Sequence, residues 1–255
     1  MRILFTNDDG VCAPGLLALV SAFSRAGHTA FVCAPDRERS AVGHGVSMRI
    51  LHAKPMDMPG AARAWAVDGL PADCASLGLY LCRDVGVDMV VSGINRGMNQ
   101  GGACVYSGTV AAALEASMCG FQGLAVSLCV RQPGGEREAD YATAARVALR
   151  VAGWMPDHPL PRGVAYNLNV PPLPYELLRG IVPARLAPVY LVDPKYEESQ
   201  DEQGRGFLYA NGEGQPPYDP DYDTISTGQG YATLTKLTWD MRLNADDAEL
   251  GKIDL

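Results

Sequence analysis

The chain has 255 residues, 29 of them acidic and 21 basic, which gives a formal charge of −8. Its 47% hydrophobic and 20% charged residues are typical of a folded globular protein and argue against a disordered or fibrous one. The length allows one large or two small domains. The negative charge disfavours a polynucleotide ligand, because a phosphate backbone would be repelled. A small phosphorylated ligand remains compatible, since one cation or one helix terminus can reverse the field locally.

Apolar runs alternate with helical patterns through the first two thirds of the chain. Residues 2–6 form a short apolar run that ends at Asn-Asp-Asp-Gly, and Pro14 suits the first turn of a helix that stops at Gly27. Further strands are predicted at 29–35, 88–94, 123–128 and 165–170, and helices at 71–83, 107–119 and 138–153. This alternation predicts an α/β fold with a doubly wound, mostly parallel sheet. Ligands of such sheets bind beyond the carboxyl ends of the strands.

The sequence changes in character after residue 172. Residues 193–223 are rich in Gly, Pro, Asp and Tyr, which indicates an extended hairpin or arm too polar for a core and suited to a partner subunit. A last strand is predicted at 231–239. We therefore expect an α/β core over 1–172 and a C-terminal part over 173–255, packed together as one domain.

The seven cysteines form no CxxC pair, and several lie in apolar runs. We expect buried thiols in a reducing compartment. Acidic residues follow the first apolar run at once, so no signal peptide is expected, and no segment approaches the roughly 20 apolar residues of a membrane span. These features predict a cytoplasmic protein without a membrane partner.

Polar loops follow three predicted strands, at residues 7–10, 36–40 and 92–102. Asp8 and Asp9 can share one ion if the chain turns at Gly10, and a cation would relieve the repulsion between the two carboxylates. Together with Asn95 and Ser40 they form a set of hard oxygen ligands, which favours Mg²⁺, Mn²⁺ or Ca²⁺ over zinc. The alternative is that residues 7–10 form only a turn and a helix cap.

A predicted helix begins after Ser107-Gly108-Thr109. Small residues at a helix start leave backbone N–H groups uncovered, and the hydroxyls of Ser107 and Thr109 could add donors to a phosphate. Alternatively, Ser107 only caps the helix.

Other polar residues of these loops have two interpretations each. Asn95 and Asn99 could be ligands or turn residues that satisfy their own backbone. His44 lies near Ser40 in the sequence and could meet a substrate. Arg37 and Arg39 could balance phosphate charge or form ordinary surface ion pairs.

Several common nucleotide and hydrolase motifs are absent from the sequence. It contains no GxGxxG after a strand, no GxxxxGK[ST], no HExxH and no GxSxG. An acidic pair after the first strand also suits a phospho-acceptor receiver domain, but such a domain needs an aspartate where this chain has Ser92-Gly93-Ile94-Asn95. A phosphatase, a nucleotide- or phosphate-sensing module and a receiver-like regulator remain as hypotheses, with the phosphatase favoured.

At these positions the sequence resembles the SurE (survival protein E) family of 5′/3′-nucleotidases. The segments that carry the resemblance occur in the family's order and cover most of the chain: ILFTNDDG, APDRERSAVGHG, DGLPADC, VSGINRGMNQG, YSGTVAAALEA and ISTGQGYATLTKL. Each segment alone is modestly specific, whereas the ordered set is highly specific.

The resemblance implies a Rossmann-like fold with an extended C-terminal arm and a homodimer or homotetramer formed by arm exchange. It implies one divalent ion per subunit, Mg²⁺ or Mn²⁺, held by Asp8, Asp9, Ser40 and Asn95, and a phosphate site formed by Asn99, Ser107, Gly108 and Thr109. The implied activity is hydrolysis of nucleoside 5′- and 3′-monophosphates, with short polyphosphate as a side substrate in some members. Asp8 and Asp9 are then the catalytic residues, either by activating a water through the metal or by direct nucleophilic attack.

Overall fold

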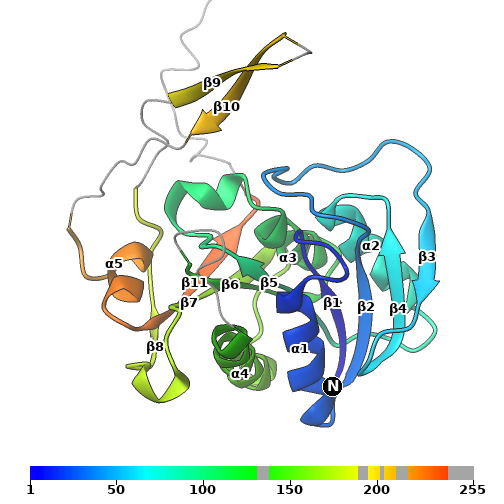
Figure 1. Ribbon diagram of the computed structural model, residues 1–255. Helices are drawn as coiled ribbons and strands as arrows, with labels where there is room; N and C mark the ends of the chain where they lie inside the picture. Colours follow the sequence, from blue (N-terminus) through cyan, green and yellow to red (C-terminus); the bar gives the residue numbers. More distant parts are fainter. Residues whose placement is uncertain (131–137, 189–194, 202–203, 211–217, 241–255) are drawn as a thin grey trace, which may run out of the picture.

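The computed structural model describes residues 1–130, 138–188, 195–201, 204–210 and 218–240 (Figure 1). The strands are β1 (Arg2–Thr6), β2 (Thr29–Pro35), β3 (Ala53–Met56), β4 (Ala61–Val67), β5 (Met89–Arg96), β6 (Gln122–Leu128), β7 (Val164–Val170), β8 (Ile181–Pro183), β9 (Lys195–Asp201), β10 (Gly204–Ala210) and β11 (Ala232–Thr238). The α-helices are α1 (Pro14–Arg25), α2 (Pro71–Leu81), α3 (Gly108–Met118), α4 (Glu138–Trp154) and α5 (Asp223–Gly228), and short 3₁₀ turns include Gly101–Val105.

One sheet of nine strands, in the order β3-β4-β2-β1-β5-β6-β7-β11-β8, forms the centre of the molecule. The six strands from β4 to β7 are parallel, β3 and β11 run antiparallel to their neighbours β4 and β7, and β8 is parallel to β11. From β1 the chain crosses to β2 on one side, while β5 pairs with β1 on the other. The order of the strands therefore reverses at β1, and the carboxyl ends of β1 and β5 form the switch point, where doubly wound sheets bind ligands. The predicted α/β fold is confirmed.

Helices cover both faces of the sheet, with α1 and α4 on one face and α2 and α3 on the other (Figure 1). Successive side chains of β1 point to opposite faces of the sheet. Phe5 packs in the hydrophobic cluster under α1 and α4, and Leu4 packs in the cluster under α2. Phe5 meets Phe23 of α1 edge to face, with ring centroids 5.2 Å apart. Such a pair adds about 0.5–1.5 kcal/mol beyond the area it buries. Burial on both faces explains why β1 reads as a continuous apolar run.

Two regions of regular structure were not predicted. Strands β3 and β4 form the edge beyond β2, and most of their residues are partly or fully exposed. Alanine-rich, half-exposed segments give a weak strand pattern, and Pro55 is tolerated because β3 lies at the edge. Helix α5 begins at Asp223, the last residue of the stretch predicted to be an arm too polar for a core. That description is wrong for Asp223, which is fully buried.

Strands β9 and β10 pair as an antiparallel hairpin outside the main sheet (Figure 1). The hairpin lies within the stretch predicted to form an arm. Its aromatic residues Tyr196 and Phe207 are 60% and 59% exposed. A two-stranded hairpin is marginally stable alone in water, so exposed aromatic rings on it suit contact with another surface.

All seven cysteines are free thiols. Cys33, Cys74 and Cys82 are buried, as expected, but Cys12 and Cys119 are exposed. The expectation of buried thiols is wrong for these two because they lie in connections at helix ends, before α1 and after α3, and not in the strands. Among the residues placed by the structure, no helix is long and apolar enough to cross a membrane.

Candidate active site

Hydrogen bonds join the loop after β2 and the end of β5 to the loop after β1. The N–H of Arg39 donates to the carbonyl of Asp8 over 2.7 Å, which joins the β2 loop to the β1 loop. The N–H of Arg96 donates to Oδ2 of Asp9 over 3.0 Å, which joins the end of β5 to the same loop. These two hydrogen bonds bring residues adjacent to Ser40 and Asn95 to the loop that carries Asp8 and Asp9.

The turn that carries the two aspartates is held by Asn7. Its Nδ2 donates to the carbonyl of Gly10 over 2.8 Å, and its Oδ1 accepts from the N–H of Gly10 over 3.2 Å. Gly10 has φ 102°, and a Cβ there would lie 3.0 Å from the carbonyl carbon of Arg37. Residues 7–10 thus form a turn, as one interpretation predicted, and this turn presents Asp8 and Asp9 at the strand end.

Asp8 is 4% exposed and faces the start of α3. The hydroxyl of Thr109 donates to its Oδ1 over 2.5 Å, and the N–H of Thr109 donates to its Oδ2 over 3.2 Å. Burial raises the pKa of Asp8 to about 6, the hydrogen bond from the Thr109 hydroxyl opposes this rise, and the charge of Asp9 adds to it. A carboxylate that is buried beside a second carboxylate is a group whose charge a cation would stabilise.

The other predicted metal ligands lie in the same loops and are more exposed. Asp9 and Asn95 are partly buried, and Ser40 is exposed. The amide of Asn95 donates to the carbonyl of Gly97 over 3.0 Å, which leaves its Oδ1 as the side-chain atom suited to a cation. The hydroxyl of Ser40 donates to Oε1 of Glu38 over 2.6 Å and keeps its oxygen lone pairs.

This donor set fits a hard divalent cation. It offers two carboxylates, one amide oxygen and one hydroxyl, all oxygen atoms, as Mg²⁺ and Mn²⁺ prefer. No group of three or more His, Cys, Asp and Glu side chains suited to a metal occurs in the part of the chain that the structure describes. A zinc-type cluster is thus not found in that part, and the mixed oxygen set around Asp8 is the candidate centre.

The start of α3 packs directly against this turn. Ser107 is the N-cap, and its hydroxyl oxygen accepts from the N–H of Val110 over 3.1 Å, so it caps the helix and keeps its own O–H as a donor. A Cβ on Gly108 would lie 2.8 Å from Cγ of Pro71 and 2.9 Å from Cβ of Asp8. Only glycine allows this approach of the helix to the aspartate. Because the N–H groups of Thr109 and Val110 are engaged, the donors that remain for an anion in this first turn are the N–H of Gly108 and the hydroxyl of Ser107.

Asn99 lies in the loop that leads to α3, and it belongs to a buried polar cluster. Its N–H donates to Oδ1 of Asn169 over 3.0 Å, its Nδ2 donates to the hydroxyl of Ser127 over 2.8 Å, and its carbonyl accepts from Asn167 and Asn169. Asn99 is therefore more than a turn residue that satisfies its own backbone, since its partners come from β6 and β7.

The remaining predicted side chains lie around the site with other partners. Nε2 of His44 is 3.0 Å from Oε2 of Glu115 on α3. Arg39 contacts Oδ1 of Asp36 over 3.3 Å, as the ion-pair interpretation predicted, and Arg37 is exposed. None of these contacts places His44, Arg37 or Arg39 on the carboxylate pair itself.

Sequence reasoning missed a second set of residues that holds the 99–101 loop. Nε2 of Gln100 donates to the carbonyl of Asp223 and to the hydroxyl of Thr227, each over 2.9 Å, and the N–H of Gly101 donates to Oδ2 of Asp223 over 2.9 Å. Of these residues, Thr227 lies in the segment ISTGQGYATLTKL, which the resemblance marked as the family's closing segment, and Asp223 precedes that segment. Nothing in its composition connects it to a loop more than 120 residues earlier in the chain.

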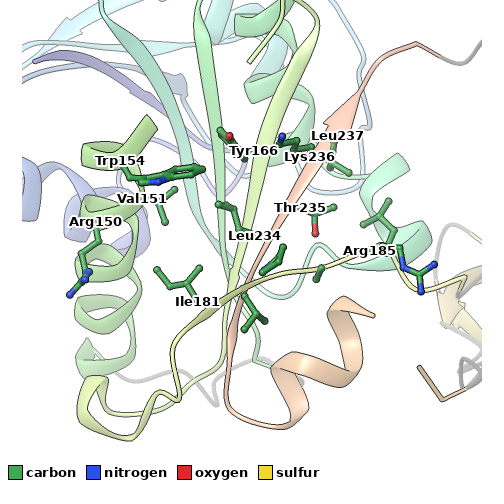
Figure 2. Close-up of a pocket in the computed structure, with 14 residues that line it drawn as sticks. Arg150, Val151, Trp154, Tyr166, Ile181, Arg185, Leu234, Thr235, Lys236 and Leu237 are labelled. Atoms are coloured by element: carbon green, nitrogen blue, oxygen red, sulfur yellow. The ribbon is translucent and has the colours of Figure 1, made fainter. Parts of the chain in front are cut away.

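Two large cavities lie away from the aspartates. One, of about 870 Å³, is lined mainly by apolar side chains of α4, β7, β8 and β11, including Trp154, Tyr166 and Leu234 (Figure 2). The other, of about 910 Å³, lies between α1 and α4. Neither is lined by a residue predicted to bind metal or phosphate, so the candidate site at the strand ends is separate from both cavities.

The fold and the site define a doubly wound α/β protein with a paired-carboxylate centre at the switch point of its sheet, next to a capped helix start. Comparison with known proteins agrees. The family model described as Survival protein SurE matches residues 3–191. A protein of Moorella thermoacetica named 5′-nucleotidase SurE is 40% identical over 254 residues, which cover 98% of this chain and 95% of that protein.

A protein of the same name from Geobacter sulfurreducens is 48% identical over 182 residues, covering 71% of this chain and 66% of that protein. The crystal structure of the SurE protein from Aquifex aeolicus is 29% identical in sequence, covers 95% of each chain, and superposes with a TM-score of 0.79. The chain therefore belongs to the SurE family.

Proposed function

We propose that this protein is a divalent-metal-dependent phosphomonoesterase that hydrolyses nucleoside 5′- and 3′-monophosphates to nucleoside and phosphate, with short polyphosphate as a further substrate. The observation that carries the proposal is the buried Asp8 beside Asp9 at the sheet's switch point, facing the start of α3. The relatives named 5′-nucleotidase SurE support the substrate class.

Each residue of the site has a role in this proposal. Asp8, Asp9, Asn95 and Ser40 hold one Mg²⁺ or Mn²⁺ per subunit. When bound, the cation supplies positive charge for a phosphate oxygen and favours deprotonation of a water molecule. The N–H of Gly108 and the hydroxyl of Ser107 donate to the other phosphate oxygens. A phosphate contact from Asn99 remains a prediction, although its amide donates to Ser127 in the structure. Charge that develops on the phosphate is thereby met by fixed donors.

Thr109 takes a revised part in the proposal. We expected it to donate to phosphate, and that remains a prediction, but its hydroxyl and its N–H both donate to Asp8 in the structure. Two donors on one carboxylate fix its orientation and favour its charged form. We infer that Thr109 positions Asp8 for the cation.

The first test is phosphate release from AMP with Mg²⁺ or Mn²⁺. We expect Asp9→Asn to lower the rate by at least about a hundredfold, since one charged ligand of the cation is lost. The matched control is Asp57→Asn, which changes an exposed aspartate after β3 and should leave the rate unchanged. Full activity of Asp9→Asn in EDTA, with an unchanged far-UV spectrum, contradicts the proposal.

The same assay separates the rival hypotheses. A sensing module would bind AMP without releasing phosphate, and a receiver-like regulator would become stably phosphorylated by a small phosphodonor, which intact-mass measurement detects. A panel of 5′- and 3′-monophosphates across several metals then fixes the preferred phosphate position and ion. We further propose a cytoplasmic homodimer or homotetramer, joined through the arm that contains β9 and β10.

A further inference from the structure

A buried carboxylate joins the C-terminal segment to the loop between β5 and α3. Asp223 is fully buried, and both of its oxygens accept hydrogen bonds from backbone N–H groups. Oδ2 accepts from Gly101 over 2.9 Å, and Oδ1 accepts from Ala187 over 3.0 Å and from Thr224 over 2.8 Å. The donors belong to three segments far apart in the sequence. Burial raises the pKa of Asp223, and the three N–H groups act against that rise.

The loop that Asp223 holds is rich in glycine. It contains Gly97, Gly101 and Gly102, and Gly97 and Gly101 have φ of 133° and 52°. Glycine-rich backbone has high conformational freedom, so its position depends on the hydrogen bonds made to it. Residues 99, 100 and 101 are each tied to the C-terminal half of the chain: Asn99 to β7, and Gln100 and Gly101 to α5.

Both ends of this loop belong to the proposed site. The loop follows Asn95, a proposed metal ligand, and it leads to Ser107 and Gly108, the proposed phosphate donors. A displacement of about 1 Å at a site loop can lower a rate far more than it lowers stability. The loop therefore needs a rigid partner, and a buried carboxylate with three donors is one.

We propose that Asp223 is a positioning residue of the active site, which acts through Gly101 and, with Thr227, through Gln100. The inference rests on the proposed function for its kinetic consequence only. Asp223 touches no substrate; it fixes the loop whose ends present the cation and phosphate ligands. Thr227 supports it, since its hydroxyl accepts from Gln100 and donates to the carbonyl of Asp223 over 2.9 Å.

The test compares Asp223→Asn with Asp221→Asn. Asparagine keeps the size of the side chain, but its NH₂ group would face an N–H where a carboxylate oxygen had accepted. Asp221 is a matched control, because it lies two residues away and its side chain is 74% exposed. Below the unfolding temperature we expect Asp223→Asn to raise the KM for AMP and the inhibition constant of inorganic phosphate on the order of tenfold. The control should match the wild type.

A second pair keeps the test decisive if Asp223→Asn does not fold. Thr227→Val removes the hydroxyl that meets Gln100, and Ser226→Ala removes a neighbouring hydroxyl that bonds to Pro220 within the same segment. Both are buried residues of α5. We expect Thr227→Val to raise KM in the same direction as Asp223→Asn, but less, and Ser226→Ala to leave it unchanged.

Two readouts separate this inference from a purely structural role and from the proposed function. A structural role would lower the folded fraction, and with it kcat, at constant KM. Hydrogen exchange of residues 97–105 needs no turnover, and we expect faster exchange in Asp223→Asn than in Asp221→Asn. The inference is overturned if KM is unchanged in both Asp223→Asn and Thr227→Val. It is also overturned if hydrogen exchange of residues 97–105 in Asp223→Asn equals that in Asp221→Asn. Absence of phosphate release by the wild type overturns the proposed function, and the exchange comparison still decides the role of Asp223.

Discussion

Asp8 and Asp9 differ in their surroundings although they are neighbours in the chain. Asp8 points inward to Thr109, whereas the carboxylate of Asp9 accepts from the backbone of Arg96 at the end of β5. The sequence indicated that a cation could relieve a carboxylate pair. It could not indicate that Thr109 serves Asp8, because that contact depends on how closely α3 approaches β1. Contacts between distant segments are set by packing and leave no local pattern.

The raised pKa of Asp8 predicts how the metal-free protein responds to pH. Its pKa is 3.8 in the absence of perturbation and about 6 in the fold, so the folded state binds the proton more tightly than the unfolded chain. Asp8 therefore favours folding below pH about 4, and this contribution is lost as the pH rises to about 6. Two pKa units correspond to roughly 3 kcal/mol.

Urea unfolding in EDTA at several pH values, for the wild type and for Asp8→Asn, measures this effect. The free energy of unfolding of the wild type relative to the variant should fall as the pH rises through that window. Saturating Mn²⁺ should oppose the fall at pH 7, because a cation stabilises the ionised carboxylate. A difference between the two proteins that does not change with pH contradicts the buried, shifted Asp8.

Among the elements, those with strong periodic burial were predicted well. The predicted strands 2–6 and 29–35 match β1 and β2 residue for residue, and the helices predicted at 71–83, 107–119 and 138–153 match α2, α3 and α4 to within two residues at each end. The two strands are buried on both faces and appear as short apolar runs between turn residues, while the helices are long enough for apolar residues to recur at helical spacing. Helix α5 has six residues, too few for such a period to appear.

The contact between α3 and β1 gives a test at the level of elements. Gly108→Ala would place a methyl group 2.8 Å from Pro71 and 2.9 Å from Asp8, so helix, turn or both must move. We expect a loss of about 1–3 kcal/mol in the free energy of unfolding and a strong loss of phosphate release. Gly153→Ala in α4 is the control, because its Cβ would meet no atom within 4 Å.

The control should gain up to about 1 kcal/mol from the better helix propensity of alanine. Urea unfolding and the AMP assay on both variants check the two expectations. Equal activity of the two variants would show that the helix start does not need to approach Asp8 so closely.

At the scale of the whole molecule, the hairpin of β9 and β10 stands apart from the layers that build the site. A Pro- and Gly-rich stretch predicted an extended hairpin or arm, and among the described strands β9 and β10 pair only with each other. The resemblance supplied the expectation of arm exchange between subunits. The division at residue 172 also remains a prediction, although β11 joins the core sheet by pairing with β7.

Removal of the hairpin tests its proposed role in assembly. Lys195 and Ala210 face each other in the register, so a short Gly-Ser linker can replace the residues between them without stretching the chain. We expect the shortened protein to keep its far-UV spectrum and to have a smaller mass by light scattering than the wild type. Tyr196→Ser combined with Phe207→Ser should also lower the mass by light scattering, because both rings are exposed in the single chain. An unchanged mass in both proteins contradicts assembly through the hairpin.

The hydrogen bond between Gly101 and Asp223 has a consequence for how the protein is made. A ribosome adds about 5–20 residues per second from the amino terminus, so Asp9, Asn95 and Ser107 leave it well before Asp223. Until then the loop after β5 has no acceptor for Gly101 and no partner for Gln100. The nascent chain can form the parallel centre of its sheet early, yet its active site stays incomplete until α5 and β11 are synthesised. A chain interrupted shortly before residue 223 would thus form part of the fold and lack the hydrogen bonds that we propose to position this loop.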